Sequence, residues 1–408
     1  MEFTELQVLS FLISSALVFI MVPGLALFYG GLVRHKNVIG TMMHSITAIG
    51  LVSVLWVLWG YSLAFGNSVG GLGFVGDLTK FGMMGVELDE QAFMVFQGMF
   101  AIITVALIAG GFAERFKFSS YVIFSALWVT IVYAPLCHWV WGGGWLGKLG
   151  SVLGMSEAGF AMDFAGGTVV HIASGTAALA AAFIVGRRAG FGTATVTPHN
   201  VPLVLLGAGM LWFGWFGFNA GSSFDLTSGQ GVNAFVVTNV AAATAMSSWS
   251  LVSWLVTKRP SASGAAAGAV AGLVAITPAA GFVGVMPSII IGAGAGAACF
   301  VAVELVHKLR IDDSLDVFGI HGIGGMWGAL ATGIFVGVGI GLDGLDADVT
   351  RIEQVLYQII GILAAFAWSF VVSSIILLAL KYTIGLRITD TEEEIGIDLT
   401  QHGEGMNQ

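Results

Sequence analysis

Charged residues are scarce in this sequence. Only 10% of its 408 residues are Asp, Glu, Lys or Arg, whereas a soluble domain carries about 25%. Hydrophobic residues make up 57% of the chain, and the mean hydropathy is +0.91. These values exclude a soluble enzyme with a large core and predict a chain that crosses a membrane many times. Nothing in the composition indicates a nucleic-acid partner.

Cysteine and proline are also rare, with 2 and 7 residues, whereas glycine occurs 59 times. Cys137 and Cys299 both lie in apolar runs, so we expect neither a disulfide framework nor a cysteine metal site. Abundant small residues allow transmembrane helices to pack closely. Long unbroken apolar runs favour helices over an outer-membrane barrel, whose alternating segments are only about ten residues long. The predicted fold is therefore an all-α polytopic membrane protein.

Runs of about 20 apolar residues predict membrane-spanning helices. Eleven such spans are predicted, at 7–33, 41–65, 92–112, 119–141, 164–186, 201–219, 233–257, 264–282, 286–307, 316–338 and 355–380. Short loops such as RHKN (34–37) and KRP (258–260) separate some of them, which predicts a single transmembrane domain at 1–386 without a linker. Residues 387–408 are polar and acidic and are predicted to form a cytoplasmic tail.

Basic residues are distributed unevenly between the two sets of loops. With the N-terminus outside, twelve of the fifteen Lys and Arg residues fall on the cytoplasmic side. The other three, Lys80, Lys148 and Arg351, fall outside. Because cytoplasmic loops carry an excess of Lys and Arg, this distribution predicts an outside N-terminus and a cytoplasmic C-terminus. An error of one span would mix the two sets, so the distribution also supports an odd number of spans.

The spans form two sets of five, before and after the polar stretch at 187–200, followed by a last helix at 355–380. Two five-helix units in one chain must have opposite topology, because five is odd. This is the arrangement of an inverted repeat, with units at about 7–190 and 200–340. The working site of such a protein is expected near the midplane between the two units.

The fifth and tenth spans carry the same two polar residue types. The fifth begins DFAGGTVVH, with Asp163 at its start and His171 about 12 Å further along the helix. The tenth begins DVFGIHGIGG, with Asp316 and His321 about 7–8 Å apart. Ionisable groups at mid-depth are costly and usually line a polar path or pair with each other. We therefore predict a pathway role for both histidines, in preference to packing; a metal site would need three or four ligands.

Seven motifs also follow one another along the chain. They are PGLALFYGGLVR (23–34), FQGMFAIITVALIAGGFAER (96–115), HWVWGGGWL (138–146), DFAGGTVVHI (163–172), GWFGFNAGS (214–222), ITPAAGFVG (276–284) and DDSLDVFGIHGIGG (312–325). In these motifs the sequence resembles the ammonium transporter/ammonia channel family (Amt), which is related to the Rhesus proteins. The resemblance covers essentially the whole chain, from the first span to the HGE of the tail.

The resemblance implies an outer vestibule in which Trp141, Ser222 and Phe100 bind ammonium. An indole face attracts a cation by about 0.5–2 kcal/mol, and a hydroxyl accepts one hydrogen bond. From the sequence alone, Trp141 could equally be an anchor at the membrane interface. Asp163 is implied to orient the vestibule backbone and to add negative potential below the cation, with simple helix capping as the alternative. Asp316 is expected to be the corresponding cap at the cytoplasmic mouth.

Below this site the resemblance implies a dry gate of two stacked phenyl rings, Phe100 and Phe218, which would resist a hydrated ion. His171 and His321 would follow as neutral imidazoles that exchange hydrogen bonds with ammonia and relay a proton. The other residues implied to line the path are Trp215, Tyr29, Leu25, Val317 and Thr277. The stretch GAAAGA (264–269) departs from the family pattern, since relatives often carry a serine where Ala267 stands.

The implied protein is an ammonium transporter of the cell membrane. Ammonium would bind outside and lose a proton, and ammonia would cross past the histidines, with a separate route for the proton if transport is electrogenic. The resemblance further implies a homotrimer in contact with lipid, no cofactor, and a PII-type regulatory protein on the cytoplasmic face. The alternatives are an electroneutral gas channel of Rhesus type and an ammonium sensor. An enzyme is not expected, because a two-histidine metal site lacks ligands.

Overall fold

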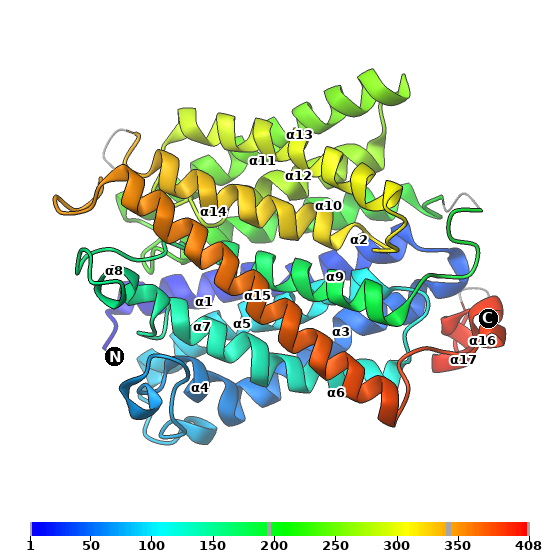
Figure 1. Cartoon of the computed structure of the whole chain (residues 1–408), viewed down its shortest axis with the longest axis horizontal. Helices are drawn as coiled ribbons and strands as arrows, with labels where there is room; N and C mark the ends of the chain where they lie inside the picture. Colours follow the sequence, from blue (N-terminus) through cyan, green and yellow to red (C-terminus); the bar gives the residue numbers. More distant parts are fainter. Residues whose placement is uncertain (1, 194–196, 340–343, 406–408) are drawn as a thin grey trace.

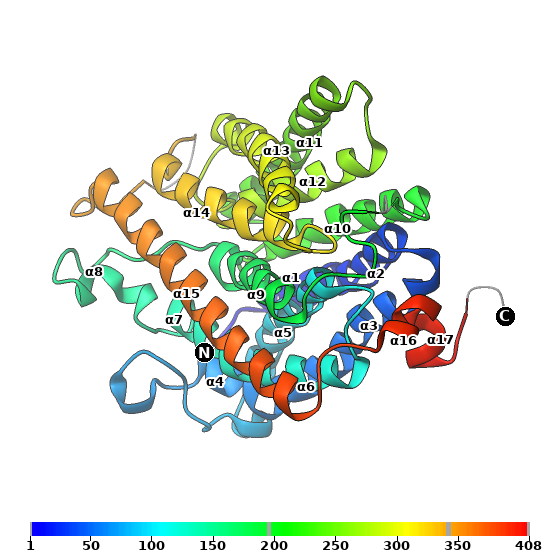
Figure 2. The ribbon, with the colours of Figure 1, turned by 45° about the vertical axis from the view of Figure 1, so that its right-hand side comes forward.

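The structure is a computed structural model that describes residues 2–193, 197–339 and 344–405. Within these ranges all regular secondary structure is helical, and the only β-contacts are two isolated bridges. Helices suit a chain in lipid because they satisfy backbone polar groups internally. The helices form one bundle, with the N-terminus and the C-terminus at opposite ends (Figures 1 and 2).

The first half of the chain consists of α-helices joined by π-helical and 3-10 pieces. The α-helices are α1 (Glu5–Phe19), α2 (Met21–Leu32), α3 (Val38–Leu55), α4 (Tyr61–Phe65), α5 (Leu88–Ile108), α6 (Phe118–Trp128), α7 (Ala134–Val140), α8 (Leu149–Val152) and α9 (Ala173–Val185). The π-helical pieces are η2 (Trp56–Gly60), η6 (Val129–Tyr133) and η8 (Gly167–Ile172). The 3-10 turns are η1 (His35–Asn37), η3 (Val69–Gly71), η4 (Phe81–Met83), η5 (Ala109–Phe112) and η7 (Leu146–Lys148).

The second half follows a similar plan and ends in a long helix. Its elements are α10 (Val201–Gly221), α11 (Gly229–Thr257), α12 (Ala262–Ile276), α13 (Val285–Lys308), the π-helical η9 (Phe318–Gly322), α14 (Ile323–Phe335), α15 (Arg351–Thr383), α16 (Asp390–Ile395) and α17 (Ile397–His402). α15 runs obliquely across the outside of the bundle (Figure 1).

Nine helical stretches in the described part of the chain are long and apolar enough to cross a membrane. Helices also occupy the other two predicted ranges, but α12 has only 15 residues and α14 only 13. Predicted and observed ends differ by four residues or fewer except at α12, which ends at Ile276. Pro278 follows there and has no N–H to continue the helix. The prediction of a multi-pass helical membrane protein is confirmed, while the exact number of crossings stays a prediction.

The end of the chain packs onto the bundle. The N–H of Gly40 in α3 donates to Asp398 at 2.8 Å, and the N–H of Ile397 donates to the Asn37 side chain at 3.0 Å. α16 and α17 therefore lie against the beginning of α3 (Figure 2). We call the end of the bundle that carries these two helices the inner end, and the opposite one the outer end.

Candidate functional site

Asp163 caps the π-helical turn η8, which carries His171. Its Oδ1 accepts the N–H groups of Gly166 at 2.8 Å and Gly167 at 2.6 Å, and its Oδ2 accepts those of Thr168 at 2.7 Å and Val169 at 3.2 Å. The Thr168 hydroxyl also donates to Oδ2. Gly166 has a φ of 119°, a conformation that glycine adopts far more readily than other residues. A buried carboxylate thus satisfies the free N–H groups at the start of this helix.

Trp141 and Phe100 meet above this turn. The indole Nε1–H of Trp141 donates to the backbone carbonyl of Asp163 at 2.8 Å, which fixes the indole plane. The Trp141 and Phe100 rings are nearly perpendicular, with centroids 6.1 Å apart. Ser222 joins this group through Phe218, whose carbonyl accepts the Ser222 hydroxyl at 3.0 Å. The structure therefore brings Trp141, Asp163 and Phe100 together, whereas Ser222 is connected to them only through the backbone of Phe218.

Phe100 and Phe218 close the path below Trp141. Their rings stack with centroids 4.1 Å apart at an interplanar angle of 28°, and both side chains are fully buried. Phe100 comes from α5 and Phe218 from α10, so the two rings join helices from opposite halves of the chain. A charge between them would lose its water and gain only weak contacts. The two predicted rings are therefore stacked and buried, while their role as a gate stays a prediction.

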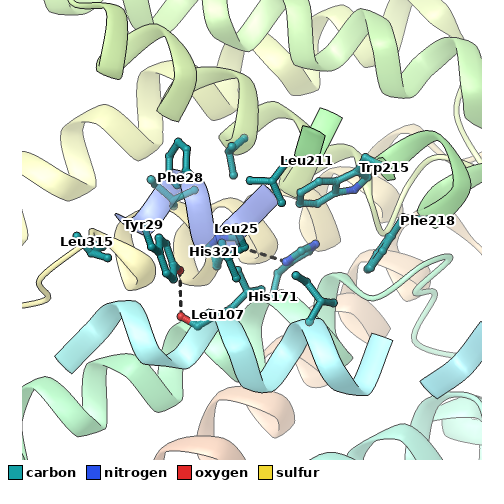
Figure 3. Close-up of a pocket in the computed structure, with 13 residues that line it drawn as sticks. Leu25, Phe28, Tyr29, Leu107, His171, Leu211, Trp215, Phe218, Leu315 and His321 are labelled. Carbon is teal, nitrogen blue, oxygen red and sulfur yellow. Dashed lines mark hydrogen bonds between the residues drawn. The ribbon is translucent and has the colours of Figure 1, made fainter. Parts of the chain in front are cut away.

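His171 and His321 meet at the centre of the bundle. Their Nδ1 atoms are 3.2 Å apart and the ring centroids 5.3 Å apart, and both rings are buried (Figure 3). A hydrogen bond between two Nδ1 atoms requires one of them to carry the hydrogen and the other to accept it. The two neutral rings must therefore be opposite tautomers. His171 also stacks on Trp215, with centroids 5.3 Å apart.

Close backbone packing brings the two histidine-bearing helices together. A Cβ atom on Gly175 of α9 would lie 2.3 Å from the backbone nitrogen of Gly322 in η9. A Cβ atom on Gly325 of α14 would likewise lie 2.9 Å from the carbonyl oxygen of Gly167 in η8. Small residues at such crossings let transmembrane helices approach closely. Each histidine helix therefore packs against the other one.

A small cavity lies around the histidine pair. Its volume is about 10 Å³, close to the lower limit for holding one water-sized molecule. It is lined by Leu25, Phe28, Tyr29, Ile103, Leu107, His171, Leu211, Trp215, Phe218, Val270, Leu315, Ile320 and His321 (Figure 3). The polar ends of its aromatic residues are occupied: the Tyr29 hydroxyl donates to Leu107 O at 3.0 Å, and Trp215 Nε1–H donates to Thr277 Oγ1 at 2.8 Å. The space is narrow, apolar and fitted with two imidazoles.

The predicted pore residues divide into two groups. Leu25, Tyr29 and Trp215 line the cavity directly. Thr277 and Val317 do not: the Thr277 hydroxyl oxygen accepts the Trp215 indole N–H, and Val317 is buried directly before η9. Several apolar lining residues were missed, namely Phe28, Ile103, Leu107, Leu211, Val270, Leu315 and Ile320. A helical spacing could have found some of them: Leu211, Trp215 and Phe218 recur at four and three residues on one face of α10.

The inner end of the path opens into a wide cavity of about 720 Å³. Ala267, His307 and Asp316 are among its lining residues. The prediction that Asp316 caps the second histidine helix is wrong. The N–H of Phe318 donates instead to Asp313 Oδ2 at 2.7 Å, while the Asp316 carboxylate lies 2.8 Å from Nε2 of His307. Asp316 has a φ of 60°, and this turn directs its side chain away from the helix start.

Buried ion pairs hold the loops at the inner end together. Glu114 lies 3.0 Å from Arg34 and 3.2 Å from Arg188, and Arg188 also lies 2.8 Å from Asp312. Burial alone would raise the pKa of Glu114, but Arg188 and Arg34 hold it below the ordinary value. Arg115 and Arg188 overcome burial in the same way and lower the pKa of Asp312. These carboxylates are therefore ionised at neutral pH.

Among the residues that the structure describes, no group of three or more His, Cys, Asp or Glu side chains could hold a metal ion. A model of the Ammonium Transporter Family matches residues 9–407. The chain belongs to the ammonium transporter family. The ammonium transporter of Bacillus subtilis is 47% identical over 401 residues, which cover 95% of each chain. The resemblance read from the seven motifs is thus confirmed.

Solved structures of ammonium transporter family members share the fold. The crystal structure of Saccharomyces cerevisiae Mep2 matches with a TM-score of 0.85 and 37% identity, over 95% of this chain and 88% of that one. A sensor Amt protein matches with a TM-score of 0.89 and 32% identity, over 97% and 98%. The protein is therefore a multi-pass membrane protein of a transporter family and not an enzyme.

Proposed function

We propose that this protein transports ammonium by binding the cation at the outer end, removing a proton and conducting ammonia past the twin histidines. The observation that carries the proposal is the His171–His321 pair inside a cavity of about 10 Å³. A space of this size suits a water-sized neutral molecule. Its apolar lining gives a desolvated cation little compensation for its lost water, whereas two imidazoles can donate to and accept from ammonia.

The outer end supplies what recognition of the cation requires. The Trp141 indole is held in place by the Asp163 carbonyl, so its face is preorganised for a cation. The Ser222 hydroxyl oxygen keeps a lone pair for one hydrogen bond from ammonium. The Asp163 carboxylate adds negative potential beneath this site while capping η8. Below them, the Phe100–Phe218 stack separates binding from conduction.

The membrane topology that goes with this function has eleven spans in two inverted five-helix repeats and a last helix, with the N-terminus outside. Two observations support it. In both halves a π-helical turn with the histidine is followed by a 13-residue helix, η8–α9 and η9–α14. The two termini also lie at opposite ends of the bundle, as an odd number of crossings requires (Figure 1). Residues 1–386 form the transporter domain and 387–408 the cytoplasmic tail.

The functional unit is proposed to be a homotrimer in the cell membrane with one pore in each subunit. A PII-type regulatory protein is the proposed partner at the inner end, where the loops and the tail come together. Both proposals rest on membership of the family rather than on a contact within this chain. No cofactor takes part in the proposed transport cycle.

The first test is the current that an ammonium pulse evokes in proteoliposomes of the purified protein. We expect a saturable current with ammonium, none with sodium, and its loss in Asp163→Ala. Asp346→Ala is the matched control, because this carboxylate is exposed at the outer end. No current from folded protein would rule out electrogenic transport and leave an electroneutral channel or a sensor. The likeness to the sensor Amt protein favours the sensor as the second candidate.

A further inference from the structure

Two aspartates cap the two histidine helices, and their carboxylates are satisfied very differently. Asp163 precedes His171 by eight residues, and Asp313 precedes His321 by the same interval. Asp163 accepts five hydrogen bonds through both oxygens. Asp313 caps through Oδ2, which accepts the N–H of Phe318, but its Oδ1 is buried without a hydrogen-bond partner in the described ranges. The inner cap is therefore only half satisfied.

The electrostatic surroundings of Asp313 disfavour its ionised form. Burial raises its pKa and the nearby Asp316 carboxylate raises it further, so that with all its neighbours present the pKa is about 7. The N–H groups of Phe318 and Val317 and the Arg115 guanidinium oppose this shift. Arg115 is already engaged elsewhere, since its guanidinium donates to the backbone carbonyl of Asp312 at 2.7 Å and to others nearby. Both protonation states of Asp313 are thus accessible near neutral pH.

Two further titratable side chains, His307 and Tyr29, lie within electrostatic reach of Asp313. His307 pairs with Asp316, and both border the inner cavity, whereas Asp313 itself is only 1% exposed. The Tyr29 hydroxyl is occupied by its bond to Leu107. A proton from the inner cavity therefore meets Asp316 first and Asp313 behind it.

We infer that Asp313 is a positioning residue whose protonation state sets the cap on η9, and so couples the placement of His321 to the pH of the inner cavity. The inference rests on the proposed transport function. The carboxylate takes a proton from hydronium in the cavity, forming an O–H bond and leaving water. When Asp313 is ionised, its bond to Phe318 is charge-assisted, and such bonds are roughly twice as strong as neutral ones. Protonation relieves the cost of the buried charge for the protein as a whole, but it weakens this hydrogen bond and loosens the turn that holds His321 against His171.

The first experiment measures the proton itself and needs no transport. The purified, folded protein is labelled with ¹³C at the aspartate carboxyl carbons, and NMR spectra are recorded between pH 5 and pH 9. We expect one resonance to titrate near pH 7 and to be missing in Asp313→Asn. In Asp316→Asn the same resonance should titrate at lower pH, because the like charge is gone. Asparagine tolerates the positive φ at position 316, so this variant should fold.

The second experiment measures transport in vesicles with the same pH on both sides, so that sidedness and a pH gradient play no part. Asp313→Asn keeps a neutral cap at every pH and is the reference. Between pH 6 and pH 8 the ionised fraction of a group with a pKa of about 7 rises about tenfold. We expect the ratio of wild-type to Asp313→Asn ammonium current to rise several-fold over this range, and the midpoint to move to lower pH in Asp316→Asn.

The outcomes separate this inference from the proposed function. A constant current ratio across the pH range would mean a purely structural cap and would overturn the inference, as would a spectrum without a titrating resonance near pH 7. If the resonance titrates but neither protein gives an ammonium current, electrogenic transport fails and the proposed coupling to it fails as well. If the resonance titrates and the ratio of wild-type to Asp313→Asn current changes with the same midpoint, the inference and the proposed function are both supported.

Discussion

The outer and inner caps of the pore start from the same sequence plan, Asp followed eight residues later by His. The outer carboxylate is followed by FAGGT, in which the positive φ of Gly166 turns the chain back so that N–H groups and a threonine hydroxyl surround the carboxylate. The inner Asp313 is followed by SLDVF, which has no glycine and adds a second carboxylate, Asp316. A few residues after the aspartate therefore decide whether both oxygens of the cap accept hydrogen bonds or only one does.

The surroundings of the two caps also differ, since the outer cap is enclosed by side chains and the inner cap lies close to a wide cavity. The outer cap lies next to buried, stacked aromatic rings, and both of its carboxylate oxygens accept hydrogen bonds. The inner cap lies behind a cavity of about 720 Å³ that is bordered by the His307–Asp316 pair. Under the proposed function, the outer cap would hold the cation site in a fixed geometry, and the inner cap would respond to the pH of the cavity.

The largest effect should come from weakening the rigid cap. In Asp163→Asn a single amide oxygen replaces two charged ones, and the amide NH₂ would face N–H donors. Since each hydrogen bond to a charged group contributes about 1.5–3 kcal/mol, we expect a loss of at least about 3 kcal/mol in unfolding free energy and no ammonium current. Thermal unfolding in detergent and the current assay measure both. A fully active, equally stable variant would contradict the role of this cap.

The next largest effect is expected from removing a histidine, which tests whether His171 and His321 act as one functional pair. His171→Ala or His321→Ala leaves the partner Nδ1 buried without a hydrogen bond, so each should lower the ammonium current at least about tenfold. The double variant should lower it little further, because no unpaired imidazole remains. Currents are compared per amount of folded protein. Losses that multiply in the double variant would show that the histidines act independently.

The sequence predicted the histidine pair because both spans carry an ionisable residue where lipid-compatible residues dominate. It misplaced the inner cap because DDSLD offers three carboxylates in five residues, and composition does not tell which one faces the helix start. Applying the eight-residue interval of Asp163 and His171 to His321 would have selected Asp313. The apolar lining residues could not be told apart from packing residues in the sequence, because the helices around the cavity are equally apolar. Helix ends were predictable where polar residues begin and less so at α12, inside an apolar run.

A smaller effect should follow from separating the two histidine helices. In Gly175→Ala the new Cβ would approach the backbone of Gly322, which cannot move as a flexible side chain would. We expect a loss of about 1–3 kcal/mol in unfolding free energy and a lower ammonium current. Gly209→Ala in α10 is the matched control, since its Cβ would point into open space. This control should be neutral or slightly stabilising. Equal effects of both substitutions would remove close packing as the reason why the histidines meet.

The smallest effect concerns the pH dependence of stability, and here two inner carboxylates should show opposite signs. The pKa of Asp313 is raised to about 7, so its ionisation destabilises the folded protein increasingly as the pH rises from about 4 through 7. Asp313→Asn should therefore gain unfolding temperature relative to wild type between pH 5 and pH 8. The pKa of Glu114 is lowered, so its ion pairs stabilise the protein above the ordinary carboxylate pKa and lose this contribution as the pH falls.

Glu114→Gln should consequently be less stable than wild type at pH 8, and the deficit should shrink in acid. The two variants share the inner end and the same change of charge, so any general effect of removing a negative charge would move both in the same direction. Differences in unfolding temperature with opposite slopes against pH would establish that Asp313 is held ionised at a cost while Glu114 is not. Parallel slopes would mean that ionising Asp313 costs the folded protein no more than ionising the paired Glu114. The two caps would then differ only in their hydrogen-bond geometry and not in their response to pH.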